Sequence, residues 1–402
     1  MQTIWRALFT LAALNLGVCS AAEPEVAASA FGHLDHVFLI IMENETDTDI
    51  LGNPNAPFIN AFAKHANHAT NYFAVGHPSL PNYLEIAGGS NFGVTNDYWP
   101  RWIGMGCVDN APNSTGCEHA IPPIAGTGVD NPVVATASSS SECNGEVGVK
   151  GPPVPHNCAL HDYPASPFTG RTIADQLVAR HLSWKSYEES LPTVSPGVAG
   201  VNYADGDWSN LSPVEVFAPG PIQKLYAVKH NPFAYFESVQ SARNAQLGLD
   251  RVKDFDGADG LWADLQGQMP NLAVIVPNQC HDMHGYVAGG TPICSSKTPS
   301  EAGFLIAQGD ATVRQLVEGI KASPTWSHGR NAIVLVWDEN DFSNAANRVL
   351  LLVETSYSAN GKRSSTAYDH FSLLRTLEAA FGLPCLNHAC DRTSRVMNEM
   401  FQ

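Results

Sequence analysis

The chain has 402 residues, of which 44% are hydrophobic and 15% are charged. This composition supplies a large core and excludes a disordered chain, a collagen-like fibre and a coiled coil, because 33 Gly and 27 Pro are spread among few charged residues. The 22 Lys and Arg against 39 Asp and Glu give a net charge of −17. Because an acidic surface repels polyanions, we expect no nucleic-acid partner.

Residues 1–22 have the pattern of a secretory signal peptide. Arg6 precedes the apolar run from Ala7 to Val18, and small residues follow that run. The run is short for a bilayer-spanning helix, which favours cleavage after Ala21 or Ala22 over anchoring. We therefore expect a secreted or periplasmic protein with no stable membrane anchor.

The predicted elements of the chain alternate in type. Runs that are apolar at every position suit strands buried on both faces, and they occur at His36 to Ile41, Leu272 to Val276, Ala332 to Trp337 and Val349 to Val353. Amphipathic stretches predict helices at Pro57 to His65, Leu80 to Ala87, Thr172 to His181, Glu301 to Lys321 and Phe371 to Phe381. This alternation predicts an α/β fold, a doubly wound α/β/α sandwich with a central, mainly parallel sheet.

Two irregular stretches interrupt the alternation. Gly, Pro, Ser and four cysteines dominate residues 88–170, which predicts a disulfide-tied insertion. Residues 191–221 are also irregular, and we expect them to cover one face of the sheet. Since no repeat or long linker is visible, residues 23–402 are predicted to form one elaborated domain.

The cysteine pattern agrees with export. Setting Cys19 of the leader aside from the nine cysteines leaves eight, an even number. Proximity alone predicts the disulfides Cys107–Cys117, Cys143–Cys158, Cys280–Cys294 and Cys385–Cys390. Zinc binding is the alternative, and the absence of a CxxC spacing disfavours it.

Acidic residues follow two of the predicted strands. Glu43 and Asn44 come directly after the first strand, and Asp338 and Glu339 come directly after the strand that ends at Trp337. Ligands of open α/β sheets bind beyond the carboxyl ends of the strands, and oxygen-rich side chains there suit a hard cation. The alternative is a pair of acidic turns that face water.

Histidines gather at two further points. His281, Asp282 and His284 follow the strand that ends at Val276, a density that suits contact with a metal ion or a phosphate. The alternative is a surface turn fixed by a disulfide. His370 stands just before the last predicted helix, where an isolated histidine is usually an ordinary N-terminal residue.

Ser79 is the candidate nucleophile. It stands where a turn rich in Gly and Pro meets a predicted helix. Free N–H groups and the helix dipole make such a position an anion site, so the hydroxyl could meet a phosphoryl group. The alternative is that Ser79 only caps the helix.

These segments together resemble the phosphoesterase family, which contains secreted acid phosphatases and bacterial phospholipases C and belongs to the alkaline phosphatase superfamily. The motifs stand in family order and span the chain from Val37 to Leu383. They are Met42-Glu43-Asn44, His77-Pro78-Ser79-Leu80-Pro81-Asn82-Tyr83, Lys229-His230-Asn231-Pro232-Phe233, Pro277 to His284, Trp337-Asp338-Glu339 and Asp369 to Thr376.

The resemblance implies an alkaline phosphatase-like sandwich with a metal site. Its ligands would be Glu43, Asn44, Ser79, Asp338 and Glu339, with Ser79 also the nucleophile. Two-metal members of the superfamily bind their second ion through Asp and His, and that set is matched incompletely here. We therefore expect one divalent ion, whose identity the residues leave open, with a second ion as the alternative.

The resemblance also implies that further residues lie around the phosphate. Catalytic roles fall to Ser79, His281, His284 and His370, and substrate binding falls to His77, Asn82, His230 and Asp282. Histidines that act in their protonated form would favour acidic pH.

The implied activity is that of a secreted, metal-dependent acid phosphatase that hydrolyses small phosphomonoesters through a phosphoserine intermediate. The alternative within enzymes is a phospholipase C-type phosphodiesterase acting on lipid headgroups. Long phospholipases of the family carry extra C-terminal domains, whereas this chain stops about twenty residues after Leu383. We therefore expect the phosphatase. An exported metal-dependent binding module is the alternative outside enzymes.

Overall fold

The computed structural model describes most of the chain outside the predicted leader and the predicted insertion. The described residues are 29–92, 94, 97, 168–191, 193–195, 198–199, 225–240, 243–288, 291–294, 299–343 and 345–402. The predicted signal peptide, the disulfides Cys107–Cys117 and Cys143–Cys158 and most of the predicted insertion lie outside these residues. No helix within the described ranges is long and apolar enough to cross a membrane.

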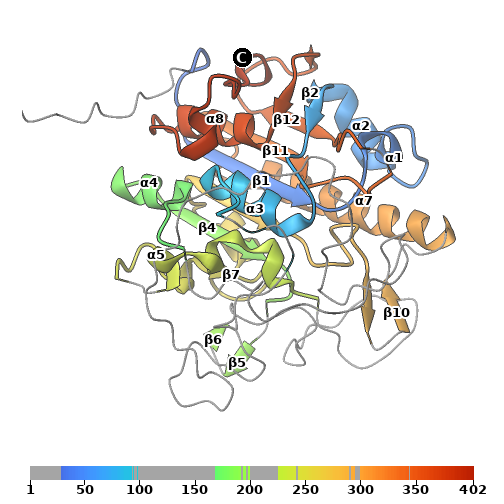
Figure 1. Ribbon diagram of the computed structural model, residues 1–402, viewed down its shortest axis with the longest axis horizontal. Helices are drawn as coiled ribbons and strands as arrows, with labels where there is room; N and C mark the ends of the chain where they lie inside the picture. The colour runs from blue at the N-terminus through green and yellow to red at the C-terminus, as the bar shows by residue number, and fades with distance from the viewer. Residues whose placement is uncertain are drawn as a thin grey trace, which may run out of the picture.

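An eight-stranded sheet forms the centre of this described part, in the order β13-β2-β12-β11-β1-β8-β4-β7. Figure 1 shows this order running from β2 and β12 at the top down to β7. The strands are β1 (His36–Met42), β2 (Asn67–Ala69), β4 (Trp184–Glu188), β7 (Val252–Lys253), β8 (Leu272–Val276), β11 (Asn331–Trp337), β12 (Leu351–Thr355) and β13 (Arg363–Ser364).

Shorter strands form three two-stranded sheets around this centre. They pair β3 (Tyr72–Phe73) with β14 (Tyr368–Asp369), β5 (Thr193–Ser195) with β6 (Val198–Ala199), and β9 (Tyr286–Ala288) with β10 (Thr291–Cys294). The α-helices are α1 (Asp47–Ile50), α2 (Pro57–His65), α3 (Ser79–Gly88), α4 (Ile173–Ala179), α5 (Glu237–Gln240), α6 (Leu261–Leu265), α7 (Pro299–Ala322) and α8 (His370–Ala380). The 3-10 turns are η2 (Val228–His230), η3 (Pro232–Tyr235), η4 (Leu249–Arg251), η5 (Asn387–Cys390) and η6 (Asn398–Met400).

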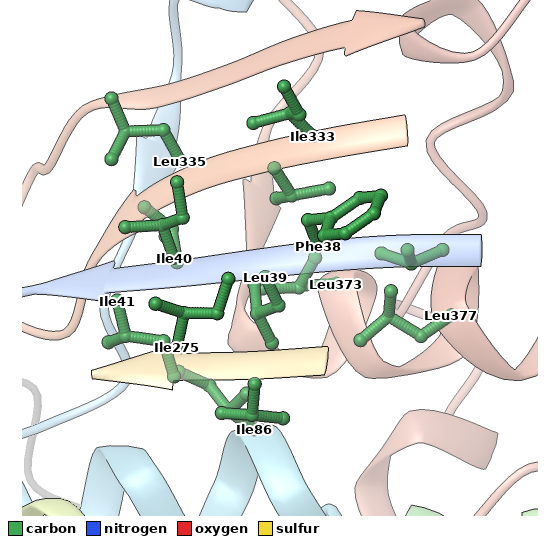
Figure 2. Packing of buried hydrophobic residues seen from close by; sticks show 14 of the residues in the cluster. Phe38, Leu39, Ile40, Ile41, Ile86, Ile275, Ile333, Leu335, Leu373 and Leu377 are labelled. Carbon is green, nitrogen blue, oxygen red and sulfur yellow. The ribbon is translucent and has the colours of Figure 1, made fainter. Parts of the chain in front are cut away.

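Strand β1 shows why the sequence produces a sandwich. Every residue from Val37 to Met42 is buried, so β1 is covered on both faces. Leu39 and Ile41 line one small cavity together with Ile86 of α3, whereas Phe38 lies near Trp326, beyond α7. Figure 2 shows this packing around β1. Side chains alternate along the strand, so its two faces bury against different helices.

The predicted elements are largely confirmed. Strand β8 and helix α2 have the predicted bounds, and β1, β11, α3, α7 and α8 differ from them by one or two residues at an end. The run at 349–353 begins its strand two residues later, and that strand, β12, is antiparallel to β11. Strand β4 was not predicted, because Lys185 and Ser186 interrupt its apolar pattern. The disulfides Cys280–Cys294 and Cys385–Cys390 are present as predicted.

The register of the central strands builds the candidate site. Met42 pairs with Trp337 in parallel register, so the residues that follow each of them emerge side by side. The Asp338 N–H donates to Met42 O at 3.0 Å, and the Glu43 N–H donates to Asp282 O at 2.9 Å. The segments after β1, β8 and β11 therefore meet at one edge of the sheet.

Candidate active site

Three buried carboxylates meet at this edge. Glu43 follows β1, and Asp338 and Glu339 follow β11. Carboxylate oxygens of the three residues lie within 4.8 Å of one another, and no residue of the three is more than 1% exposed. Like charges so close together in a dry environment repel strongly. Two acidic turns that face water, the alternative expected from the sequence, would not be buried in this way. That alternative is therefore wrong for these residues.

The oxygens of this cluster fit a divalent cation. Both carboxylate oxygens of Glu43, Oδ2 of Asp338 and Oδ1 of Asn44 are buried and have no hydrogen-bond partner among the residues that the structure describes. Asn44 has a φ of 55°, a left-handed conformation that asparagine tolerates. Burial raises the pKa of Asp338, and the charge of Glu43 raises it further. A cation would pair with these oxygens and offset the repulsion, and oxygen ligands of this kind suit hard divalent ions.

Ser79 belongs to the same constellation. It is the first residue of α3, and its Oγ donates to Oε1 of Glu339 at 2.9 Å. The other carboxylate oxygen of Glu339 contacts Nδ1 of His77, whose ring stacks on Phe342 with centroids 4.0 Å apart. The N-cap of α3 is Pro78, so the capping alternative for Ser79 is wrong. The hydroxyl instead points into the acidic cluster.

Asn82 holds the turn that presents Ser79. Its Oδ1 accepts from the N–H groups of Val75 and Gly76 at 3.1 and 3.0 Å, and its Nδ2 lies 2.9 Å from Gly76 O and 3.1 Å from Pro78 O. Asn347 also donates to Gly76 O at 2.7 Å. In these contacts Asn82 positions the backbone around Ser79, and its expected contact with phosphate stays a prediction.

His230 lies between two carboxylates. Its Nε2 is 2.7 Å from Oε1 of Glu43, an ion pair without the alignment of a hydrogen bond, and its Nδ1 is 3.4 Å from Oδ2 of Asp282. The ring stacks on Tyr83 with centroids 5.1 Å apart. Burial alone would lower the pKa of His230, but the charge of Glu43 and the contacts with Asp282 and Glu43 together outweigh it and raise the pKa well above its ordinary value. His230 thus carries positive charge beside the acidic cluster.

The loop after β8 contributes two half-buried histidines. Nδ1 of His281 lies 2.8 and 2.9 Å from the two carboxylate oxygens of Glu189. Nδ1 of His284 lies 2.6 Å from the carbonyl oxygen of Gly285, and its Nε2 lies 3.4 Å from Nζ of Lys229. The structure brings both histidines to the site edge, and their catalytic roles stay predictions.

His370 starts α8 and is fully engaged. Its Nε2 lies 2.6 Å from Asp338 O, and its Nδ1 lies 2.8 Å from the hydroxyl of Tyr72. A carbonyl oxygen can only accept, so Nε2 carries the hydrogen and Nδ1 accepts from tyrosine. Burial lowers the pKa of His370 to about 4, which keeps the ring neutral. These contacts hold the backbone of a cluster residue, and direct contact of His370 with substrate stays a prediction.

Several residues around the site received no role from the sequence. Three of them, Tyr72, Tyr83 and Glu189, contact predicted histidines. The other two are Lys229, which stands next to His230 in the sequence, and its partner Asp97. Lys229 and Tyr83 lie inside motifs that carry the family resemblance, which is the signal that could have found them. Asp97, in contrast, lies in the predicted insertion, where no pattern marks it.

Comparison with known proteins identifies the family of this chain. A model of the phosphoesterase family matches residues 49–384. The chain belongs to the phosphoesterase family. The match begins just after Glu43 and Asn44, which lie in the strand-end segment that the structure joins to it. As a family member the protein is a hydrolase of phosphoric ester bonds, as the sequence predicted.

Individual relatives of this phosphoesterase are distant in sequence. A phosphatidylinositol-3-phosphatase of Mycobacterium tuberculosis is 23% identical, over 97% of this chain and 92% of its own length. A phosphate-repressible acid phosphatase of Penicillium chrysogenum is 25% identical over 82% of this chain, which spans 55% of that protein. Among solved structures, a protein of the alkaline phosphatase superfamily from Vibrio parahaemolyticus aligns with a TM-score of 0.45 at 11% identity, covering 92% of this chain and 71% of its own.

Proposed function

We propose that this phosphoesterase is an exported, metal-dependent acid phosphatase that hydrolyses small phosphomonoesters through a phosphoserine intermediate. One observation carries the proposal. The Ser79 hydroxyl, at the first residue of a ten-residue helix, donates to Glu339 within a cluster of three buried carboxylates. A serine in that position has an acceptor for its proton, a cation-binding site beside it and the positive end of a helix dipole for the phosphoryl oxygens.

The residues of the chain suggest how the reaction proceeds. Glu43, Asn44, Ser79, Asp338 and Glu339 would hold one divalent ion. When bound, that ion would supply positive charge that stabilises the serine alkoxide and the charge developing on the phosphoryl oxygens. The identity of the ion stays open.

Ser79 and Glu339 account for the attacking side of the reaction. Glu339 Oε1 takes the proton of Ser79, whose Oγ bonds to phosphorus as the bond from phosphorus to the leaving alcohol breaks. His77 holds the other oxygen of Glu339, which fixes the direction of the accepting carboxylate. The product of this step is phosphoserine, and the oriented carboxylate keeps the nucleophile in line with phosphorus.

The loop after β8 accounts for the leaving side. His281 would give a proton to the departing alkoxide, because both nitrogens of His284 are engaged, by Gly285 O and by Lys229. The same histidine, now neutral, then takes a proton from water, whose oxygen bonds to phosphorus as the bond between phosphorus and Oγ breaks. Phosphate leaves, and the proton on Glu339 returns to Ser79. His230, which lies between Glu43 and Asp282, would attract the phosphate dianion when protonated.

The relatives support a phosphatase over a phospholipase C. By their names they include acid phosphatases and a phosphatase of a phosphorylated lipid, and both names describe release of phosphate from a monoester. The Mycobacterium protein adds phosphatidylinositol 3-phosphate to the substrates worth testing. Export is proposed from the signal pattern of residues 1–22, and we expect the protein in the periplasm or the medium.

The test is release of p-nitrophenol from its phosphate monoester and from bis-p-nitrophenyl phosphate, from about pH 4 to about pH 9, a range that brackets histidine titration. It uses metal-stripped and metal-restored protein, with Ser79→Ala as the control. Metal-dependent monoester turnover that is absent in the control would support the proposal. Preference for the diester would favour the phospholipase-type alternative, and folded, metal-loaded protein without turnover would favour the binding module.

A further inference from the structure

Lys229 and Asp97 form a buried ion pair beside the candidate active site. Nζ of Lys229 lies 2.9 Å from Oδ2 of Asp97, and each side chain is 1% exposed. Removing two charges from water costs free energy that their mutual attraction often only offsets. Apolar residues of similar volume would serve the fold equally well at such a position. Stability of the fold is therefore a poor reason for this pair.

The outer contacts of the pair reach both sides of the site. Oδ1 of Asp97 accepts from the Leu80 N–H at 2.9 Å, in the first turn of α3 and directly after Ser79. Nζ of Lys229 lies 3.4 Å from Nε2 of His284, in the loop after β8. One ion pair thus joins the helix that presents the nucleophile to the loop that presents a histidine.

The direction of the hydrogen bonds follows from the chemistry of the groups. The carbonyl oxygen of Gly285 can only accept, so Nδ1 of His284 carries the hydrogen in their 2.6 Å contact. In the neutral imidazole this leaves a lone pair on Nε2, which faces the ammonium group of Lys229. Lys229 therefore donates both to Asp97 and to His284, and the ring is held at both nitrogens.

We propose that Lys229 is a positioning residue which, together with Asp97 and through its contact with His284, fixes the loop after β8 relative to Ser79. The proposal rests on the function proposed above, in which Ser79 attacks phosphorus and His281 of this loop gives a proton to the leaving group. In-line displacement requires those two groups on opposite sides of one phosphorus atom, and a misplacement of about 1 Å can cost roughly 100-fold in rate. A bridge between α3 and the loop sets that geometry.

The first test is the steady-state kinetics of Lys229→Met on a phosphomonoester. We expect kcat to fall by roughly 30- to 100-fold with KM changed by less than about 3-fold, because orientation is lost while binding groups remain. Lys229→Arg should recover part of kcat. The matched control is Lys185→Met, which breaks the ion pair of a partly buried lysine with Asp264 at the opposite end of β4 and β8. An unchanged kcat in Lys229→Met would overturn the proposal.

A double-mutant cycle tests whether Lys229 acts through His284. In a His284→Ala background, Lys229→Met should lower kcat by less than about 3-fold, because the contact through which Lys229 holds the loop is already gone. The same fold-loss in both backgrounds would mean that Lys229 acts elsewhere. Asp97→Leu combined with Lys229→Met removes both charges together, and it replaces Lys229→Met if that single variant does not fold.

A readout without turnover separates this proposal from the proposed function. In protein with ¹⁵N-labelled histidine, the His284 signals should report hydrogen on Nδ1 and an accepting Nε2, and Lys229→Met should shift the Nε2 signal. A shift in protein that lacks phosphatase activity would leave the positioning contact standing while the proposed function fails. Turnover in the wild type with no shift and no loss of kcat in Lys229→Met would overturn the positioning role alone.

Discussion

Two groups of buried charges in this protein are neutralised in different ways. The pair of Lys229 and Asp97 is complete within the chain, since each charge meets its opposite at 2.9 Å. The cluster of Glu43, Asp338 and Glu339 gathers like charges, and several of its oxygens have no hydrogen-bond partner in the described part of the chain. His230 offsets this negative charge only at Glu43.

The difference separates buried charges that bind a ligand from buried charges that hold segments of the site in place. An incomplete set of buried charges is costly in the empty protein and becomes favourable when a cation binds. A complete pair needs nothing from outside, so it can hold neighbouring segments in place. Changes in the acidic cluster should therefore alter activity far more than folding, whereas breaking the pair should alter folding as well.

The largest effect should come from Ser79→Ala. We expect kcat on p-nitrophenyl phosphate to fall by roughly 10⁴- to 10⁶-fold, as for other covalent nucleophiles, because the attacking hydroxyl is gone. The melting temperature should stay within about 2 °C of the wild type. Ser323→Ala, which removes a buried hydroxyl bonded to Ile320 O, is the matched control and should keep full activity. Equal activity in the two variants would remove Ser79 from the mechanism.

Metal removal should come next. Chelation is expected to lower turnover by about 10³-fold and to lower the melting temperature, because an ion at 100 times its Kd contributes about 2.7 kcal/mol to stability. Adding back the divalent ion should restore both. Asp338→Asn should weaken the ion's binding and yet leave the metal-free protein as stable as the wild type or about 1 kcal/mol more stable, because one repelling charge is gone.

Calorimetry of the metal-free proteins checks whether Asp338→Asn raises or lowers the free energy of unfolding. A loss of more than about 2 kcal/mol in Asp338→Asn would show that the cluster is already satisfied within the chain.

Breaking the ion pair of Lys229 and Asp97 should destabilise the protein, the opposite of the effect expected for Asp338→Asn in the metal-free state. Asp97→Asn leaves a buried ammonium group without its counter-charge and should cost about 3–5 kcal/mol of unfolding free energy in denaturant titrations. The double change Asp97→Leu with Lys229→Met should cost much less than Asp97→Asn. A double variant as unstable as the single one would mean that packing, and not the unpaired charge, sets the cost.

The smallest effect concerns a buried carboxyl that is neutralised by a proton. Glu378 of α8 is fully buried, and burial raises its pKa from 4.5 to about 9. Between these values the folded chain holds a proton that the unfolded chain has lost, so this group's contribution to stability falls as pH rises from about 4.5 toward 9.

Glu378→Gln tests this contribution through thermal melts at several pH values. The variant should match the wild type near pH 4 and gain roughly 1–3 kcal/mol, or several degrees in melting temperature, near pH 8. A constant difference across that range would contradict the expected titration.

The sequence predicted the central layers well for a physical reason. Strands such as β1 and β8 are buried on both faces, so their residues from Val37 to Met42 and from Leu272 to Val276 are all apolar and the pattern is visible without neighbours. Strands β13 and β2, the outermost two at one side of the sheet, are too short to leave a pattern. Strand β4 carries Lys185 near its start, where the side chain reaches Asp264. This polar residue interrupts the apolar pattern, so this strand of the central sheet was not predicted.

The candidate site divides in the same way. Residues that directly follow apolar strands, such as Glu43 and Asp338, could be predicted because strand ends meet at one edge of a parallel sheet. The partners of the site histidines could not, because Tyr72 and Glu189 reach them across roughly 90 to 300 positions of the sequence. Asp97 lies in a stretch with no periodicity, and its contact with Lys229 spans 132 positions.

The sequence by itself determined which segments are strands and helices and which residue types stand at the strand ends, because local patterns of apolar and polar residues carry that information. The tertiary structure decided that Ser79 donates to Glu339, that His370 is engaged at both nitrogens and that a buried ion pair joins α3 to the loop after β8. Those contacts depend on parallel register and on packing between distant segments, and no local pattern encodes them.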